Sequence, residues 1–118
     1  MPHFVIHCNE GLLKLKPAQE IMRGIYDVAS STGLFAKSGP GGIKVRISPF
    51  EHYLTLGSQD SFIHVFGNIM EGRTEDQKKA LSSKIVQYLK TSFPDEPIIS
   101  MNVQEFERAT YCNKSMVE

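Results

Sequence analysis

The chain has 118 residues, of which 41% are hydrophobic and 22% charged, and its 13 basic residues balance its 13 acidic ones. This length suits one domain with a packed core, so we expect a single domain over residues 1–118. A net charge of zero argues against a general nucleic-acid binder, and no apolar run reaches the roughly 18 residues of a membrane span. We expect neither nucleic acid nor a membrane among its partners.

The chain begins with a segment that favours a strand. Residues 2–8 are rich in β-branched and aromatic side chains, and Asn9-Glu10-Gly11 follows with turn residues. The basic patch and long apolar stretch of a signal peptide do not precede it, so we expect a cytoplasmic protein.

Pro2 is the residue of this strand that could carry chemistry. Aminopeptidases generally remove Met1 before a small residue, and this would leave Pro2 as a free secondary amine. An internal proline nitrogen is an amide that cannot act in this way. The ordinary interpretation is that the first residues are frayed and idle, so Pro2 needs support from the rest of the chain.

The first helix and a second strand follow. Pro17 suits the first position of a helix, apolar residues recur at helical spacing up to Ala29, and Gly33 supplies the end. The glycine-rich segment 38–42 predicts irregular structure. Residues 43–47 then alternate apolar and basic side chains, so Lys44 and Arg46 should project from one face of a strand.

Beyond this strand the sequence predicts the same order of elements a second time. We expect Pro49 to interrupt the strand and residues 53–56 to continue it as an edge or hairpin arm. Residues 62–70 predict a strand, Thr74 and Gln77 form a capping-box pair, and a helix is expected up to about Phe93. Residues 98–106 predict the last strand.

The order strand, helix, strand therefore occurs twice, over about residues 2–57 and 61–107. Both first strands end in Glu-Gly, at Glu10-Gly11 and Glu71-Gly72. We expect an α+β fold of duplicated β-α-β units, with a four-stranded mixed sheet and two helices on one face. The sheet face opposite the helices would be exposed to solvent in a monomer, so we expect it to be buried against other subunits.

Other candidate sites are weaker. The four histidines lack metal-ligand spacing, so no metal site is expected, and no phosphate loop or hydrolytic triad is recognisable. Cys8 and Cys112 have no pairing pattern and are expected to be reduced. Arg73 lies at a helix start, where the helix dipole prefers an anion. It should either point into solvent or bind an anionic ligand.

The segment Glu71-Gly72-Arg73-Thr74-Glu75-Asp76-Gln77-Lys78, between a strand and a helix, resembles the signature of the tautomerase superfamily of N-terminal-proline enzymes. Three further segments, in this order and spacing, resemble the 5-carboxymethyl-2-hydroxymuconate Δ-isomerase family. They are Met1-Pro2-His3-Phe4, Thr32-Gly33-Leu34-Phe35 and Gly42-Ile43-Lys44-Val45-Arg46. The resemblance spans almost the whole chain to about Phe106.

This resemblance implies a tautomerase-like fold and a homotrimer whose active site lies between subunits, with Pro2 as the general base and no cofactor. Arg73, Lys44 and Arg46 then match the residues that bind the carboxylates and polarise the 2-oxo group. Lys44 stands where the family commonly has arginine, and lysine lacks the planar fork that grips a carboxylate. Asn102 stands where related tautomerases can carry an arginine.

Three functions remain open from the sequence. The first is an isomerase that moves a proton by a 1,3-shift in a small, anionic, unsaturated 2-oxo acid of the 5-carboxymethyl-2-hydroxymuconate type. The second is a tautomerase for another enol acid, such as a phenylpyruvate-like one. The third is a non-catalytic binding module of the same fold, which would apply if Met1 stays on the chain and acylates Pro2.

Overall fold

The computed structural model describes residues 1–36, 42–56 and 60–117. Most of the segment 38–42 that the sequence predicts to be irregular lies outside these residues. The elements, in chain order, are β1 (His3–Asn9), the 3₁₀ helix η1 (Glu10–Lys14), α1 (Ala18–Ser31), β2 (Lys44–Phe50), β3 (Phe62–Met70), α2 (Glu75–Ser92), β4 (Ile98–Phe106) and the 3₁₀ helix η2 (Lys114–Met116).

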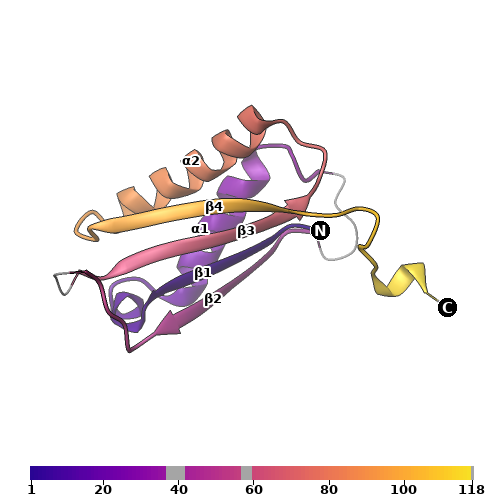
Figure 1. The fold of residues 1–118 in the computed structure, drawn as a ribbon. Coiled ribbons are helices and arrows are strands. Elements are labelled where there is room, and N and C mark those ends of the chain that lie inside the picture. The colour runs from indigo at the N-terminus through magenta and orange to yellow at the C-terminus, as the bar shows by residue number, and fades with distance from the viewer. Residues whose placement is uncertain (37–41, 57–59, 118) are drawn as a thin grey trace.

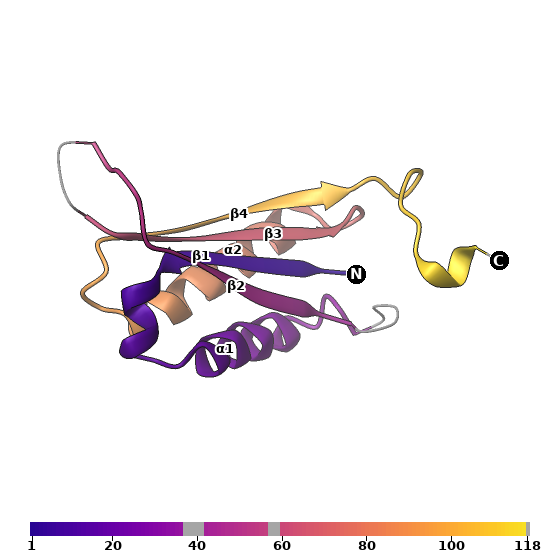
Figure 2. The ribbon, with the colours of Figure 1, turned by 90° about the horizontal axis from the view of Figure 1, so that it is seen from below.

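Within the described residues, four strands form one mixed sheet in the order β2-β1-β3-β4. The inner strands β1 and β3 are antiparallel, and each pairs in parallel with the outer strand of its own unit, β2 or β4. Figure 1 looks onto the sheet, and Figure 2 shows both helices on the same side of it. The predicted α+β fold of two β-α-β units is confirmed.

The core lies between the sheet and the two helices. Side chains alternate along β1, so Phe4, Ile6 and Cys8 face the helices and are almost fully buried. The helices present one apolar stripe each, because their buried residues recur every four positions. These residues are Ile21, Ile25 and Ala29 in α1, and Leu81, Ile85 and Leu89 in α2.

The helix ends follow the predicted capping residues closely. Pro17 is the N-cap of α1, one position before its predicted place. Gly33 follows the C-cap Thr32 with a φ of 74°, a left-handed conformation that glycine adopts without strain. At the start of α2, the Thr74 hydroxyl accepts from Gln77 N at 3.1 Å and Thr74 N donates to Gln77 Oε1 at 2.9 Å. The predicted capping box is therefore confirmed.

The prediction that Pro49 interrupts the second strand is wrong, because β2 continues through Pro49 to Phe50. Lys44 N donates a hydrogen bond to Pro2 O. Because backbone groups alternate along a strand, every second residue of β2, starting at Lys44, forms its hydrogen bonds with β1. Pro49 belongs to the other set, whose N–H groups point away from the sheet. Its missing N–H removes no ladder bond, so an outer strand accommodates the proline.

The prediction for residues 53–56 also fails. They form no strand arm and contain one isolated bridge residue, Thr55. Tyr53 instead packs by its ring, 5.3 Å from Phe50 and 6.1 Å from Phe62 between centroids. The two 3₁₀ helices were not predicted, because three to five residues are too few for a periodic pattern.

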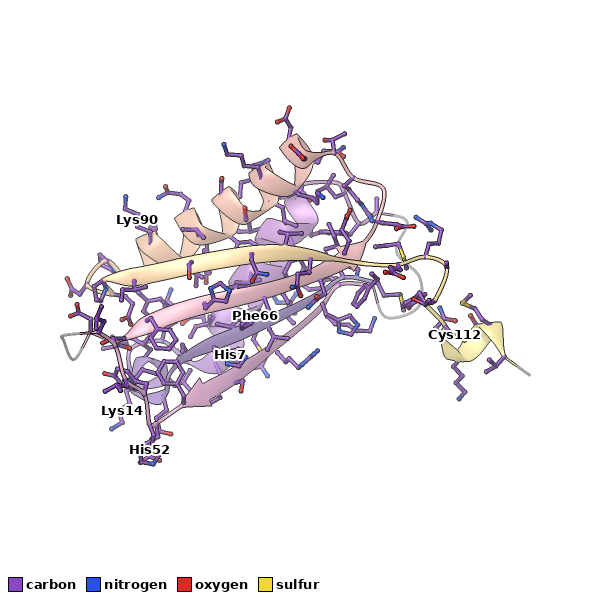
Figure 3. All side chains as sticks on the ribbon, in the orientation of Figure 1. His7, Lys14, His52, Phe66, Lys90 and Cys112 are labelled. Atoms are coloured by element: carbon purple, nitrogen blue, oxygen red, sulfur yellow. The ribbon has the colours of Figure 1, made fainter. Side chains whose placement is uncertain are left out.

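The sheet face away from the helices, called the open face below, is covered by neither helix (Figures 1 and 2). Phe66 lies near its centre with 40% of its surface exposed, and its ring contacts His7 and His64 at centroid distances of 5.1 and 4.5 Å. Figure 3 shows the labelled His7 and Phe66 side chains on this face. No helix in the described part of the chain is long and apolar enough to cross a membrane.

Substituting Gly24→Ala tests the contact between the two helices. A Cβ at Gly24 would overlap the hydroxyl and ring of Tyr88, whose hydroxyl also donates to Glu20 O at 3.4 Å. We expect overpacking to cost about 1–3 kcal/mol, more than the gain of about 1 kcal/mol in helix propensity. Urea unfolding at fixed protein concentration should therefore show a net loss of stability.

The matched control is the same substitution in a Tyr88→Ala background. The overlap is then absent, and Gly24→Ala should stabilise the protein through helix propensity alone. A destabilisation of equal size in both backgrounds would contradict the packing explanation.

Candidate functional site

The sheet topology gathers the predicted site residues at one edge. β1 and β2 begin where β3 and β4 end, because the register pairs His3 with Lys44 on one side and with Asn68 on the other. The ends of the parallel strands β3 and β4 pair there through Met70 and Phe106. We call this edge the proline edge; it comprises residues 2–3, 44–46, 68–73 and 104–108, and it lies beside the label N in Figure 1.

Pro2 is held firmly at this edge. Its side chain is less than 2% exposed, and its carbonyl oxygen accepts a hydrogen bond of 2.9 Å from Lys44 N. With Met1 in place the Pro2 nitrogen is an amide, so the basic nitrogen is the α-amine of Met1. The beginning of the chain is part of the packed fold and is not frayed.

The α-amine of Met1 lies in a cationic, partly desolvated environment. Burial is the largest cause that lowers its pKa below the ordinary value, and the charges of Lys44 and Arg73 lower the pKa further. Each of these effects disfavours the protonated form. The structure thus brings Lys44 and Arg73, which are 29 positions apart in the sequence, to the same amine.

Arg73 is half-buried and does not point freely into solvent, one of the two placements that the sequence left open. Nη1 donates to Met70 O at 3.0 Å and Nη2 donates to Leu34 O at 2.7 Å, while Cζ lies 5.3 Å from the Phe35 ring centroid. The guanidinium joins the end of β3 to the segment after α1. Guanidinium has five N–H donors, and among the described residues no carboxylate pairs with it, so donors remain for an anion.

Arg46 contacts the residue that follows Pro2. Its Nη1 lies 3.2 Å from His3 Nδ1, and because arginine can only donate, the imidazole must accept and be neutral. Burial, then the charges of Arg46 and Lys44, lower the pKa of His3. Lys44 Nζ donates to Gly42 O at 3.1 Å. Both cations of β2 therefore influence the same small region as the α-amine.

The second β-α-β unit has a counterpart of this cluster that contains no lysine or arginine. As His3 pairs with Lys44 in the sheet, His64 pairs with Ser100. His64 Nδ1 lies 2.6 Å from Ser100 Oγ, and Nε2 lies 2.8 Å from Asn102 Oδ1. Asn102, which stands where related tautomerases can carry an arginine, completes a hydrogen-bonded group without lysine or arginine.

Two open cavities adjoin the cations of the proline edge. A groove of about 550 Å³ between α1 and β2 includes Arg23, Tyr26 and Lys44 in its lining. A cavity of about 440 Å³ at the start of α2 includes Arg73 and Arg108. The α-amine is thus influenced by one cation from the lining of each cavity.

Sequence reasoning missed Arg108, although a signal was present. Arg73 follows β3 by three positions and Arg108 follows β4 by two. Strands that run in parallel end at the same edge of a sheet, so two arginines placed soon after such strands would be expected to meet. The aromatic side chains of His3, Phe106 and Tyr111 were missed for a different reason, since their contacts, at centroid distances of 5.9 and 6.0 Å, follow no sequence spacing.

The remaining candidates do not converge. Among the described residues no group of three or more His, Cys, Asp or Glu side chains is placed to hold a metal ion. Both cysteines are free thiols, Cys8 buried and Cys112 exposed. Burial, followed by the charge of Glu96, raises the pKa of Cys8 to about 11. Its thiol is therefore neutral and unsuited to nucleophilic chemistry at neutral pH.

Solved structures with this fold include several tautomerase-type proteins. A 5-carboxymethyl-2-hydroxymuconate isomerase from Deinococcus radiodurans R1 is 23% identical, with a TM-score of 0.79 over 96% of this chain and 88% of that chain. Pt0534 inactivated by 2-oxo-3-pentynoate is 20% identical, with a TM-score of 0.78 over 98% and 94% of the two chains. A fused 4-OT symmetric trimer is 15% identical, with a TM-score of 0.78 over 98% and 94%. These similarities establish a tautomerase fold.

Family membership follows from the sequence itself. No curated protein matches the chain, but a sequence model of the 5-carboxymethyl-2-hydroxymuconate isomerase family matches residues 2–118. The match begins at Pro2 and includes the whole proline edge. The chain therefore belongs to the 5-carboxymethyl-2-hydroxymuconate isomerase family, a family of isomerase enzymes.

Proposed function

We propose that the protein is an isomerase that moves a proton by a 1,3-shift in a small, anionic, unsaturated 2-oxo acid, with the amine of Pro2 as general base after removal of Met1. The observation that carries this proposal is the buried position of Pro2, fixed by the bond from Lys44 N to its carbonyl, next to the Met1 α-amine whose pKa is lowered by burial and then by the charges of Lys44 and Arg73. A neutral amine and two cations are the groups needed to take a proton from an organic anion.

The proposed reaction conserves all atoms. The neutral amine removes the enol proton of a 2-hydroxydienoate, and the electrons move into the conjugated system to form a dienolate. The protonated amine then returns the proton to a carbon of the same molecule, giving the 2-oxo isomer and the free amine. A base whose pKa lies near the working pH is suited to both steps. An α-amine has an ordinary pKa of about 8, and burial and nearby cations lower this pKa toward neutral pH.

The cations bind the acid and stabilise the dienolate. Arg73 is half-buried and already oriented by two carbonyl groups, so little entropy is lost when a carboxylate binds to its remaining donors. Lys44 provides a point charge, and Arg46 keeps His3 neutral beside it. The inactivation of Pt0534 by 2-oxo-3-pentynoate supports the substrate class, because that compound is itself an unsaturated 2-oxo acid.

Turnover of 2-hydroxymuconate should depend on a free Pro2 amine. We expect intact mass to show the loss of one methionine, and Pro2→Ala, which replaces the secondary amine with a primary one outside a ring, to lower kcat/KM by at most the roughly 10²–10⁴ that a general base contributes. Ketonisation followed by absorbance is the measurement. Equal rates in the wild type and Pro2→Ala would exclude catalysis by proline.

The matched control is a chain with one alanine inserted between Met1 and Pro2. Its processed form keeps every cation, but the Pro2 nitrogen is an amide and the free amine lies one residue farther out, so turnover should fall well below that of the wild type. A full-length mass for the wild type, together with binding of 2-oxo acids without turnover, would favour the binding-module function. Rapid turnover of phenylenolpyruvate alone would favour the alternative enol acid.

The pH dependence of kcat/KM gives the pKa of the catalytic amine, and this pKa should depend on the cations around it. Burial and then the charge of Lys44 lower the pKa of the Met1 α-amine. We expect the same charge to act on the adjacent Pro2 amine, so Lys44→Ala should raise the pKa of that amine and shift the acid limb of the profile to higher pH. Lys90→Ala, on the outer surface of α2 and far from the amine (Figure 3), should leave the limb in place. An acid limb that stays in place, or moves to lower pH, in Lys44→Ala would contradict the arrangement.

We also infer a homotrimer that buries the open face. This face presents Phe66 between two histidines and is covered by neither helix. Exposed apolar sheet surface of this kind favours a closed symmetric assembly, and a solved structure of this fold is a symmetric trimer.

Phe66→Glu should break this assembly, since a carboxylate at the centre of the buried face would lose its hydration without a partner. Light scattering is expected to give a trimer for the wild type and a monomer for the variant at micromolar concentration. Lys90→Glu is the control and should remain trimeric. A monomeric wild type, or a trimeric Phe66→Glu, would contradict the interface.

A further inference from the structure

We propose that His3 is a positioning residue of the site, whose neutral imidazole accepts a hydrogen bond from Arg46 and fixes its guanidinium at the proline edge. The inference rests on the proposed function, in which Arg46 is one of the cations that bind an acid. It adds a residue that acts through Arg46 and does not itself bind the substrate.

His3 and Arg46 meet because the register of β1 and β2 places them on the same face of the sheet. His3 pairs with Lys44 and Val5 pairs with Arg46, and residues paired in this way point to the same side. Phe4 faces the helices, so this side is the open face. Arg46 lies one pair along from His3, and its Nη1 reaches His3 Nδ1 at 3.2 Å.

Arg46 differs from Arg73 in how its guanidinium is held. Arg73 is oriented by two backbone carbonyl groups, whereas Arg46 is exposed and bonds to the imidazole of His3. An arginine side chain has about 2 kcal/mol of rotamer entropy, part of which a free guanidinium loses when it binds a carboxylate. A guanidinium that an acceptor already orients loses less, and its other N–H donors stay available for the acid.

The imidazole is itself held in place from another strand. Its ring meets the ring of Phe106 edge to face, with a centroid distance of 5.9 Å and an interplanar angle of 84°. Phe106 ends β4 and packs against Tyr111 at a centroid distance of 6.0 Å. Since Nδ1 accepts from Arg46, the proton of the neutral ring is on Nε2. The ring therefore presents a fixed acceptor to the guanidinium.

The surroundings of His3 favour the neutral form that can accept. Burial is the largest cause that lowers its pKa, followed by the charges of Arg46, Lys44 and the α-amine of Met1. Its neighbours in the sheet register are Lys44 on β2 and Asn68 on β3, so neither strand offers it a carboxylate at this position. A protonated ring would have no lone pair for Arg46. The cations that bind the acid therefore also preserve the acceptor that holds one of them.

The second β-α-β unit contains the same kind of contact. In both units the strand histidine bonds to the residue two positions after its register partner. In the first unit His3 bonds to Arg46, and in the second His64 bonds to Asn102. The contact thus holds a cation in the unit that has the terminal amine and a neutral amide in the other. This is the arrangement expected if the histidine serves the site.

A double-mutant cycle on His3 and Arg46 tests this role. The probe is trans,trans-muconate, which has the carbon chain of 2-hydroxymuconate but no enol to react. His3→Phe keeps a ring against Phe106 and removes the acceptor, so calorimetry near neutral pH should show binding about 3- to 10-fold weaker, the range of one net hydrogen bond. In an Arg46→Ala background His3→Phe should change the affinity by less than about twofold, because the guanidinium that it positions is gone.

A rescue variant and a distant histidine separate positioning from support of the fold. His3→Gln supplies an amide oxygen that can accept from Arg46, so it should bind muconate within about twofold of the wild type. His52→Phe changes an exposed histidine beyond the other end of β2 (Figure 3) and should leave the affinity unchanged. In turnover of 2-hydroxymuconate, His3→Phe should raise KM and leave kcat within about twofold, as expected when binding alone is weakened.

Four results would overturn the inference: no binding of muconate to the wild type, an unchanged affinity in His3→Phe, the same loss from His3→Phe with and without Arg46, or a His3→Gln variant as weak as His3→Phe. The reaction is judged separately, because muconate binding needs no turnover. If the wild type does not convert 2-hydroxymuconate while the cycle still shows coupling between His3 and Arg46, the proposed reaction fails and the role of His3 stands.

Discussion

The parallel pairing of β1 with β2 is the constraint on which the site depends. It begins at the bond from Lys44 N to Pro2 O, so the second residue of the chain is already part of the ladder. Because that pairing buries Pro2 and sets Lys44 beside His3, the terminal amine is held among cations. An amine on a mobile terminus would be hydrated, with the pKa of an ordinary α-amine and no fixed direction for proton transfer.

Local sequence chemistry predicted most of the fold, because each unit has its own signals. Thr74 with Gln77 and Gly33 mark helix ends through hydrogen bonds that span only a few residues. The position of Pro49 could not be judged in the same way, since a proline is harmful or harmless according to whether its missing N–H faces a neighbouring strand. That depends on β2 being an outer strand and on its register, both of which are set by residues more than 40 positions away.

The candidate site was predictable in its cations and not in their contacts. Lys44, Arg46 and Arg73 were identified from position and resemblance, but the carbonyl partners of Arg73 come from the end of β3 and the segment after α1. The two units also diverged in a way that only the sheet register explains. Arg46 with His3 corresponds to Asn102 with His64, and the amine has no equivalent in the second unit because the chain begins only once.

Pro49 also affects how chains of this protein can associate. The outer side of β2 carries N–H and C=O groups that could accept another strand, which is the usual route to open-ended aggregation. Because Pro49 has no N–H on that side, a further strand can bond fully only near Val45 and Ile47. Continuous growth of sheets edge to edge is thereby disfavoured, and closed assemblies that use the faces of the sheet have an advantage over fibres.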